Sequence, residues 1–341
     1  MRKIKIGING FGRIGRNAFK IAFGRPDTEV VAINDLTDNA TLAHLLKHDS
    51  TFGTYDAKVE TKDGYMLVSG QKIAMTAEPD VTKLDWKKYG VDVVLECTGR
   101  FTKLKDARKH ISQGGAKKVV ISAPAKEGDV KTIVLGVNEQ ELSADDHVVS
   151  CASCTTNCIA PVMSVIDEVF GIKKGMMTTI HAYTSTQALL DSPAKDLRTA
   201  RSAAENIIPT TTGASKAVAE VLPPLGSVFG GMSVRVPVPC VSLSDLTFIL
   251  KRTVTAEEVN KALKAAAKEP FYQGILAVTE EELVSTDFLG HPASAIVDLP
   301  LTAVVDGDMV KVVAWYDNEW GYSNRLVELA VETGRLIKEK E

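Results

Sequence analysis

The sequence predicts an α/β domain with a parallel sheet, followed by an α+β domain with a mainly antiparallel sheet. Its 341 residues are enough for two domains of ordinary size. In the first half, short apolar runs at 91–99, 117–124 and 132–137 alternate with helical patterns, as buried parallel strands do. In the second half, residues 241–250 and 309–316 alternate apolar and polar side chains, which is typical of a sheet with one covered face.

A glycine-rich turn joins the first strand pattern, residues 3–9, to a helical pattern. Gly10, Gly12 and Gly15 form G-x-G-x-x-G, in which the glycines allow a tight turn, close approach to a pyrophosphate, and packing of helix on strand. The next strand pattern ends at Asp35, where a carboxylate would bind ribose hydroxyls. We therefore interpret the first half as a Rossmann dinucleotide-binding domain. The alternative is a plain glycine turn, with Asp35 only capping a helix.

Two small polar residues follow later strand patterns of the same half. Thr98 comes after one buried run and Ser122 lies near the end of the next. Ligands of parallel sheets bind beyond the carboxyl ends of the strands, so we expect both residues near the cofactor. Each of them is equally well explained as an ordinary turn residue.

Cys154 stands directly before an apolar helical pattern at 159–169. A helix start presents free backbone N–H groups and a partial positive charge, and both favour the thiolate, which is the nucleophilic form. A buried structural cysteine is the alternative interpretation. The chain has five cysteines, an odd number without the spacing of a disulfide framework, so a reducing compartment is expected.

A cysteine nucleophile needs a base, and His181 is the best placed of six histidines. It ends a strand pattern beside a long stretch of weak periodicity at 184–208, and loops of that length are usually functional. The hydroxyl-rich turn at 210–216 precedes a helix and could bind a phosphate. Arg201 and Arg235 could supply positive charge for bidentate contacts to an anion. A hydrogen-bonded structural histidine and ordinary salt bridges remain the alternatives.

Other classes of function are disfavoured by composition. A net charge of −3 gives no reason to expect nucleic acid or a membrane surface as a partner. No apolar run is long enough to span a bilayer and no signal-peptide pattern is present, so a cytoplasmic location is expected. His44 and His48, and the set Cys151, Cys154 and Cys158, have spacings that could suggest a metal, but no further ligand is placed and we expect none.

Four segments carry a resemblance to a known family: 7–16, 152–158, 209–214 and 315–319. They occur in the order found in the phosphorylating glyceraldehyde-3-phosphate dehydrogenases, which the chain resembles over nearly its whole length. The resemblance implies NAD-dependent oxidative phosphorylation of D-glyceraldehyde 3-phosphate to 1,3-bisphosphoglycerate, in glycolysis or gluconeogenesis. It also implies that Cys154 forms a thiohemiacetal and then a thioester, and that His181 is the base.

The resemblance further implies roles for individual residues. The substrate's C3 phosphate would be held by Thr184 and Arg235. The attacking inorganic phosphate would be held by Ser153, Thr155, Thr212, Gly213 and Arg201, with Arg198 as a competitor for the last place. The contacts to NAD would come from Arg13, Ile14, Asp35, Ser122 and Asn318, the last of them holding the carboxamide.

The resemblance also implies an organisation into domains and subunits. An NAD-binding domain is expected at 1–152, completed by a C-terminal helix at 318–341, and a catalytic domain at 153–317. A homotetramer is expected. Asp35 would repel a 2′-phosphate, and Leu36 and Pro193 stand where the NADP-using members carry small polar residues, so NAD is the expected cofactor.

Three rival functions fit the sequence less well. Erythrose-4-phosphate dehydrogenases share the scaffold but typically lack the residues seen here as Thr184, Thr212 and Gly213. A semialdehyde dehydrogenase of amino-acid synthesis is disfavoured by the Asn318 segment and the two expected anion sites. A non-catalytic binding protein is disfavoured by the intact Cys154 and His181. One departure from the family is Cys151, which replaces an asparagine usual three residues before the nucleophile.

Overall fold

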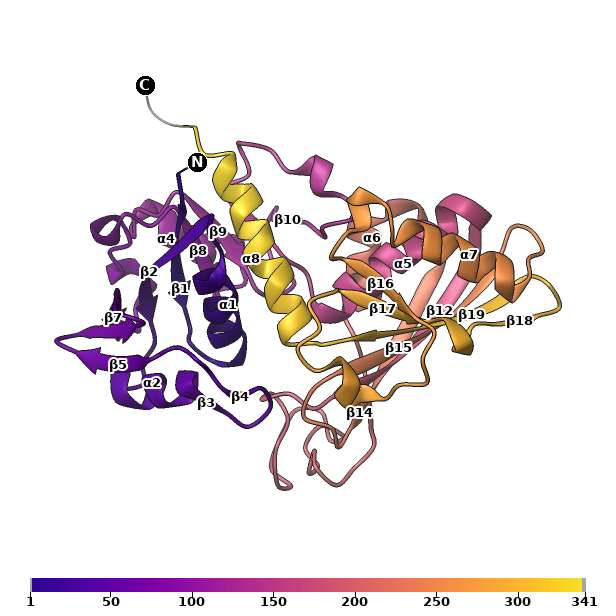
Figure 1. Ribbon diagram of the computed structural model, residues 1–341, viewed down its shortest axis with the longest axis horizontal. Coiled ribbons are helices and arrows are strands. Elements are labelled where there is room, and N and C mark those ends of the chain that lie inside the picture. The colour runs from indigo at the N-terminus through magenta and orange to yellow at the C-terminus, as the bar shows by residue number, and fades with distance from the viewer. Residues whose placement is uncertain (1, 339–341) are drawn as a thin grey trace. The chain divides into compact units, whose positions relative to one another are not determined.

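The computed structural model describes residues 2–338, which fold into two compact units (Figure 1). The first unit contains the chain up to Ile133, Glu139–Ala152 and the residues from Ser323 onward. The second contains Val134–Asn138 and Ser153–Tyr322. Each unit has its own sheet, mostly parallel in the first and largely antiparallel in the second, which confirms the predicted fold class.

The described part of the first unit holds a nine-stranded sheet in the order β10-β11-β9-β8-β1-β2-β7-β6-β5. Neighbours from β10 to β7 are parallel, and β7, β6 and β5 run antiparallel to one another. The strands are β1 (Ile4–Asn9), β2 (Thr28–Asn34), β5 (Val59–Lys62), β6 (Tyr65–Val68), β7 (Gln71–Thr76), β8 (Val93–Glu96), β9 (Lys118–Ile121), β10 (Lys131–Thr132) and β11 (Val148–Ser150). A separate hairpin pairs β3 (His48–Asp49) with β4 (Gly53–Thr54). The helices are α1 (Arg13–Gly24), α2 (Asn39–Lys47), α3 (Leu104–Ala107), α4 (Lys109–Ser112) and the greater part of α8 (Trp320–Arg335).

Backbone hydrogen bonds align the carboxyl ends of the central strands. The amide of Gly10 donates to Asn34 across β1 and β2, at 2.8 Å. On the other side the amide of Cys97 donates to Asn9, at 2.7 Å, and that of Ser122 donates to Glu96, at 3.0 Å. The turns that follow these strands therefore meet at one edge of the sheet, which is the edge that binds ligands in parallel sheets.

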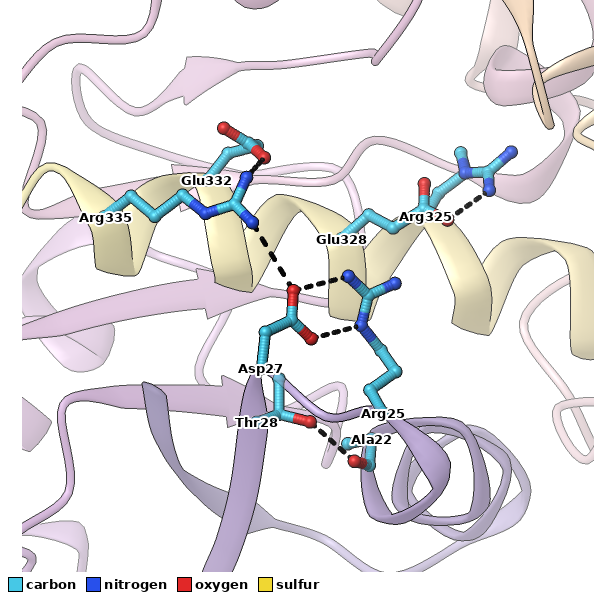
Figure 2. A network of polar contacts seen from close by, with 8 residues as sticks. All are labelled: Ala22, Arg25, Asp27, Thr28, Arg325, Glu328, Glu332 and Arg335. Carbon is cyan, nitrogen blue, oxygen red and sulfur yellow. Dashed lines mark hydrogen bonds and ion pairs between the residues drawn. The ribbon is translucent and has the colours of Figure 1, made fainter. Parts of the chain in front are cut away.

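Helix α8 is tied to the start of β2 by charged side chains, as Figure 2 shows. Arg25 donates two hydrogen bonds to Asp27, at 2.9 and 2.8 Å. Arg335 of α8 reaches the same carboxylate at 3.4 Å and Glu332 at 2.6 Å. The expected helix at 318–341 is thus present as Trp320–Arg335, and residues 339–341 lie outside the described part of the chain.

The described part of the second unit holds an eight-stranded sheet in the order β13-β14-β12-β15-β19-β17-β16, with β18 also paired to β19. The pairs β12–β14 and β16–β17 are parallel, and the others are antiparallel. The strands are β12 (Ile172–Ala182), β13 (Ile208–Thr210), β14 (Phe229–Val236), β15 (Ser242–Leu250), β16 (Leu276–Thr279), β17 (Ala295–Asp298), β18 (Ala303–Val305) and β19 (Met309–Tyr316). The helices α5 (Cys154–Phe170), α6 (Ala214–Val221) and α7 (Ala256–Ala266) pack together over this sheet (Figure 1).

Helix α5 forms the centre of the second core. Its residues are apolar on almost every side, and Ile159, Val162 and Ile166 are fully buried against the sheet. A helix that is apolar all round is expected in a core rather than at a surface. This packing holds the first turn of α5, where Cys154 lies, in a fixed position. Within residues 2–338, no helix combines the length and the apolarity needed to cross a membrane.

The prediction of a strand at 132–137 is largely wrong. The run at 132–137 was expected to be a buried strand, yet β10 contains only Lys131–Thr132. After it the chain turns, because Gly136 has a left-handed φ of 81° and Val137 donates to the carbonyl of Val134. The Asn138 side chain also accepts a hydrogen bond from the Val134 amide, at 2.8 Å. Apolar composition alone could not reveal this local competition with strand pairing.

Candidate active site and cofactor pocket

Cys154 and His181 form a pair in the second unit. Ser153 caps α5 by accepting a hydrogen bond from the amide of Thr156 at 3.0 Å, so Cys154 becomes the first helical residue. His181 is the second-last residue of β12 and is 4% exposed. The Sγ atom of Cys154 lies 3.5 Å from Nε2 of His181. The structure therefore brings together the two residues that the sequence suggested as nucleophile and base.

Arg235 lies on the other side of the histidine. One guanidinium nitrogen is 2.6 Å from His181 Nδ1 and 3.0 Å from the carbonyl oxygen of Ala182. That carbonyl oxygen also lies 2.6 Å from Nδ1. Nδ1 thus meets a donor, the Arg235 guanidinium, as well as an acceptor, the Ala182 carbonyl oxygen. The tautomer with its proton on Nδ1, donated to Ala182, is the one that leaves the lone pair of Nε2 facing Cys154.

Burial determines the charge state of the pair. It lowers the pKa of His181, and the positive charge of Arg235 acts in the same direction, so the imidazole is neutral near pH 7. Burial also raises the pKa of the Cys154 thiol, although Arg235 and hydrogen bonds with Thr155 oppose this. Burial thus works against the helix-start effect expected from the sequence. In this arrangement the thiol needs a base, and Nε2 of His181 is in place to serve.

The other residues expected to bind phosphate are distributed around this unit. Thr184 follows β12 by two residues, and its hydroxyl lies 2.8 Å from that of Thr186. The hydroxyl of Thr212 accepts a hydrogen bond from the amide of Ala214 at 3.2 Å, and Gly213 is the N-cap residue of α6, without a side-chain cap. These hydroxyls and the uncapped amides of α6 are donors of the kind that bind oxyanions.

Two expected phosphate ligands have other partners in the structure. Arg201 is exposed and donates to Asp191 at 2.7 Å. Thr155 is buried, and its hydroxyl lies 2.9 Å from the phenolic oxygen of Tyr316. Arg201 therefore reaches an anion only by leaving Asp191, and the Thr155 side chain faces the core.

Sequence reasoning did not assign Tyr316 and Ser242. The phenolic oxygen of Tyr316 bridges Thr155 and Thr179, each at 2.9 Å, and its ring meets that of His181 edge-on at 5.9 Å. The hydroxyl of Ser242 accepts from the Ala182 amide and donates to Asn318 Oδ1, both at 3.0 Å. The only signal in the sequence was that Tyr316 lies in the segment 315–319, which also contains Asn318.

A separate cavity of about 280 Å³ opens in the first unit at the carboxyl edge of its sheet. Its polar lining includes four of the predicted residues, Gly10, Gly12, Asp35 and Thr98. Both oxygens of Asp35 are oriented by backbone amides, Oδ2 by that of Phe11 at 2.7 Å and Oδ1 by that of Thr37 at 3.0 Å. The carboxylate is thereby fixed in the position from which it would accept ribose hydroxyls.

The glycines of the turn fit a bound dinucleotide. Gly10 has a left-handed φ of 90°. A Cβ on Gly15 would lie 2.1 Å from the carbonyl oxygen of Gly10, so the helix could not pack there with any side chain. A Cβ on Gly12 would meet nothing within 4 Å, so its absence leaves open space beside the turn. This open cradle is what close approach of a pyrophosphate requires.

The remaining cofactor candidates have varied positions. Arg13 and Ile14 are the first two residues of α1, whose N-cap, Gly12, provides no side-chain cap. The guanidinium of Arg13 donates to Asp49 at 2.7 Å. Ser122 directly follows β9. Asn318 belongs to the second unit, and its contact with a carboxamide stays a prediction.

Among the described residues, no three His, Cys, Asp or Glu side chains gather as metal ligands would.

The fold and these residues define an NAD-dependent oxidoreductase with a cysteine in its second unit. Residues 4–104 match the family model for the glyceraldehyde 3-phosphate dehydrogenase NAD binding domain, and residues 153–318 match that for its C-terminal domain. The chain belongs to the glyceraldehyde 3-phosphate dehydrogenase family, which confirms the family and the NAD cofactor predicted from sequence.

Relatives with this name align along nearly their whole length. The glyceraldehyde-3-phosphate dehydrogenase of Geobacillus stearothermophilus is 58% identical over 328 residues, covering 96% of this chain and 97% of the relative. That of Streptomyces coelicolor is 55% identical over 336 residues, covering 98% and 99%. That of Zymomonas mobilis is 51% identical over 337 residues, with the same coverage of 98% and 99%.

Proposed function

We propose that the protein oxidises D-glyceraldehyde 3-phosphate to 1,3-bisphosphoglycerate, using NAD and inorganic phosphate, in glycolysis and gluconeogenesis. One observation carries the proposal: Cys154 Sγ lies 3.5 Å from His181 Nε2, with Arg235 on the far side of the same imidazole. A thiol, an imidazole and a guanidinium thus lie close together, which supports their roles as nucleophile, base and phosphate-binding cation. Family membership and the cofactor pocket support the same reaction.

The first covalent step uses Cys154 and His181. The sulfur attacks the aldehyde carbon while Nε2 of His181 takes the thiol proton, and the resulting alkoxide receives that proton from His181 to give a thiohemiacetal. His181 then removes the hydroxyl proton, and the carbon loses hydride to form a thioester on Cys154. Bound NAD supplies the hydride acceptor for this oxidation. An oxygen of inorganic phosphate attacks the thioester carbonyl, and the Cys154 sulfur leaves as a thiolate, which takes the proton held on His181.

Two anion sites are part of the proposal. Arg235 and Thr184 would bind the substrate's C3 phosphate, because Arg235 is the cation nearest the imidazole. The attacking phosphate would be held by Ser153, Thr212, Gly213 and Arg201, and by Thr155 through its backbone, because the Thr155 side chain faces the core. For this, Arg201 must exchange its exposed ion pair with Asp191 for the phosphate. Exposed ion pairs are worth about 0–1 kcal/mol, so the exchange is energetically small.

The decisive experiment follows formation of reduced nicotinamide with NAD, glyceraldehyde 3-phosphate and inorganic phosphate. We expect phosphate-dependent turnover that is lost in Cys154→Ser and retained in Cys158→Ala, a matched change one helical turn further along α5. Turnover of erythrose 4-phosphate but not of glyceraldehyde 3-phosphate would favour the sister activity. No turnover of either substrate by folded, reduced protein would leave only a binding role.

A homotetramer is also proposed. The segment between β12 and β13 exposes three leucines, Leu189, Leu190 and Leu197, to 75%, 73% and 81%. A cluster of exposed leucines on one loop is costly in water and is typical of a surface covered by another subunit. Light scattering at micromolar concentration should give four times the chain mass, and a monomer mass would contradict the proposal. Free thiols at all five cysteines accord with the proposed cytoplasmic location.

A further inference from the structure

A chain of buried polar side chains runs beneath the cofactor pocket of the first unit. At its centre Glu96 and His110 are both fully buried, with 3.0 Å between Oε2 and Nε2. Trp86 donates its indole N–H to His110 Nδ1 at 2.9 Å. On the other side, Asn9 donates to Glu96 Oε2 at 2.6 Å, and Asn34 donates to Asn9 Oδ1 at 2.8 Å.

The donor and acceptor roles in this hydrogen-bonded network are determined by Trp86 at one end and Glu96 at the other. An indole nitrogen only donates, so His110 Nδ1 must accept, and the proton on Nε2 is donated to Glu96. Glu96 also receives the amide N–H of Thr98 at 2.8 Å and the hydroxyl of Thr98. With the Asn9 amide, four donors point at this one side chain, and only a carboxylate accepts all of them.

The carboxylate determines how two amides are turned. Because Asn9 must present its nitrogen to Glu96, its oxygen faces Asn34 and accepts from it. Asn34 therefore points its nitrogen toward Asn9 and toward the carbonyl oxygen of Glu78, at 3.0 Å. Its own oxygen accepts from the Glu78 amide at 2.9 Å and from the Thr76 hydroxyl at 2.8 Å. Asn34 thus clamps the backbone of Glu78 through both its N–H and its C=O.

This clamp lies at the wall of the cavity in which the cofactor would bind. Asn9, Asn34 and Glu78 line the cavity together with Asp35, the residue placed to bind ribose hydroxyls. Leu36, Leu84 and Phe101 provide apolar walls of the kind that enclose a flat base. The Glu78 carbonyl accepts only one hydrogen bond, from Asn34, within residues 2–338, and so offers its second lone pair to an amino group.

We propose that Glu96 is a positioning residue that, through Asn9 and Asn34, makes the pocket select the 6-amino group of adenine over the 6-keto group of hypoxanthine. An amino group meets a carbonyl oxygen as a donor, whereas a keto group meets it as a second acceptor and is repelled. Replacement of Glu96 by glutamine puts an N–H among four donors. The side-chain amides of Asn9 and Asn34 must then rotate by about 180°, so that the Asn9 oxygen accepts from the new N–H. The two hydrogen bonds between Asn34 and the backbone of Glu78 are lost.

The test compares the dissociation constants of NAD and of nicotinamide hypoxanthine dinucleotide, measured by calorimetry on the full chain. The native protein should bind NAD more tightly. In Glu96→Gln the preference for NAD should fall about tenfold, the effect of one hydrogen bond. His110→Phe is the matched control, because it removes one donor but leaves the carboxylate and packs among Trp86 and Phe101. It should lower the melting temperature and keep the native preference.

Two results would overturn the proposal: an unchanged preference in folded Glu96→Gln, or an equal loss of preference in His110→Phe. If Glu96→Gln does not fold, Asn9→Ala decides the matter, because it breaks the relay without adding an N–H beside Glu96. A fall in preference then supports the proposal, and an unchanged preference contradicts it. Because binding is measured without turnover, the result does not depend on the proposed reaction.

Discussion

Arg235 lies 2.6 Å from the imidazole of His181 because the two residues are register partners on the parallel strands β14 and β12. Fifty-four residues of sequence separate them, and the sheet alone brings them together. The group proposed to bind the substrate's phosphate therefore lies against the proposed base. A phosphate that draws the guanidinium toward itself also changes the electrostatic field at the histidine.

Replacement of Arg235 by glutamine should weaken recognition of the phosphate group. We expect kcat/KM for glyceraldehyde 3-phosphate to fall about 10²-fold, since a charge-assisted bidentate contact contributes about 1.5–3 kcal/mol. Unphosphorylated glyceraldehyde should be affected much less. Steady-state kinetics on both substrates check this, with Arg252→Gln, a half-exposed arginine stacked on Phe170, as the control. Equal losses on the two substrates would show that Arg235 acts elsewhere.

Replacement of His181 by asparagine should lower kcat by about 10²–10⁴-fold, the usual contribution of a positioned base. Burial raises the pKa of Cys154, so without the base its thiol ionises only at high pH. The rate of alkylation by iodoacetamide in this variant should keep rising as the pH passes the ordinary thiol range near 9. A rate that is flat from pH 6 upward would contradict the assigned role.

Iodoacetamide should modify Cys154 first in the native protein. Cys151, Cys158 and Cys240 are buried, and only Cys97 and Cys154 are partly exposed. Burial raises the pKa of both partly exposed thiols, but Cys97 also faces Glu96, whereas Cys154 faces Arg235. Peptide mapping after brief alkylation near pH 7 checks the order. A label found first on Cys97 would refute this account of reactivity.

The glycine turn offers two contrasting substitutions. Gly15→Ala should destabilise the protein and lower its melting temperature, because its Cβ would overlap the Gly10 carbonyl. Gly12→Ala meets no protein atom within 4 Å, so the fold should keep its melting temperature. Its affinity for NAD should nevertheless fall at least tenfold, because the methyl group occupies the approach of the pyrophosphate. Calorimetry for NAD and thermal unfolding separate the two effects; unchanged affinity in Gly12→Ala would place the pyrophosphate elsewhere.

The contacts of Asp27 with Arg25 and Arg335 should make part of the stability depend on pH. Hydrogen bonds from Arg25 lower the pKa of Asp27, so its contribution is complete above the ordinary carboxyl pKa of about 4. The contribution is lost as the pH falls from there through the lowered value. Asp27→Asn should reduce the free energy of unfolding by about 1 kcal/mol at pH 7, and the difference should vanish in acid.

Urea unfolding at pH 7 and near pH 3 measures the difference for Asp27. Glu60→Gln, which breaks an exposed pair with Lys58, serves as the control and should have no measurable effect. A loss of stability in Asp27→Asn that is equal at both pH values would show that packing, not charge, is responsible.

The sequence predicted best where the signal is continuous along the chain. The β1 strand, the glycine turn, α1 and Asp35 occur within 35 residues, and their spacing alone specifies the turn and the cofactor edge. The helix start at Cys154 was likewise a local signal. Neither required knowledge of which strands pair.

The rest depends on pairing between distant segments. The sequence around Arg13 does not predict its ion pair with Asp49. The sequence around Thr155 does not predict the hydrogen bond between its hydroxyl and that of Tyr316. Glu96 stands within an apolar run, which predicts only a buried strand. In the structure its side chain accepts hydrogen bonds from three different side chains. Such partners are determined by sheet order, which a single sequence does not reveal.

The three tryptophans of the chain are divided between the units: Trp86 lies in the first, and Trp315 and Trp320 lie in the second. Trp86 is buried beneath the cofactor edge, and Trp315 is stacked on Phe288. Intrinsic fluorescence can therefore be assigned to one unit at a time by replacing the tryptophans of the other with phenylalanine. The chain thus contains its own optical probes, with which the unfolding of each unit can be followed separately, with and without NAD.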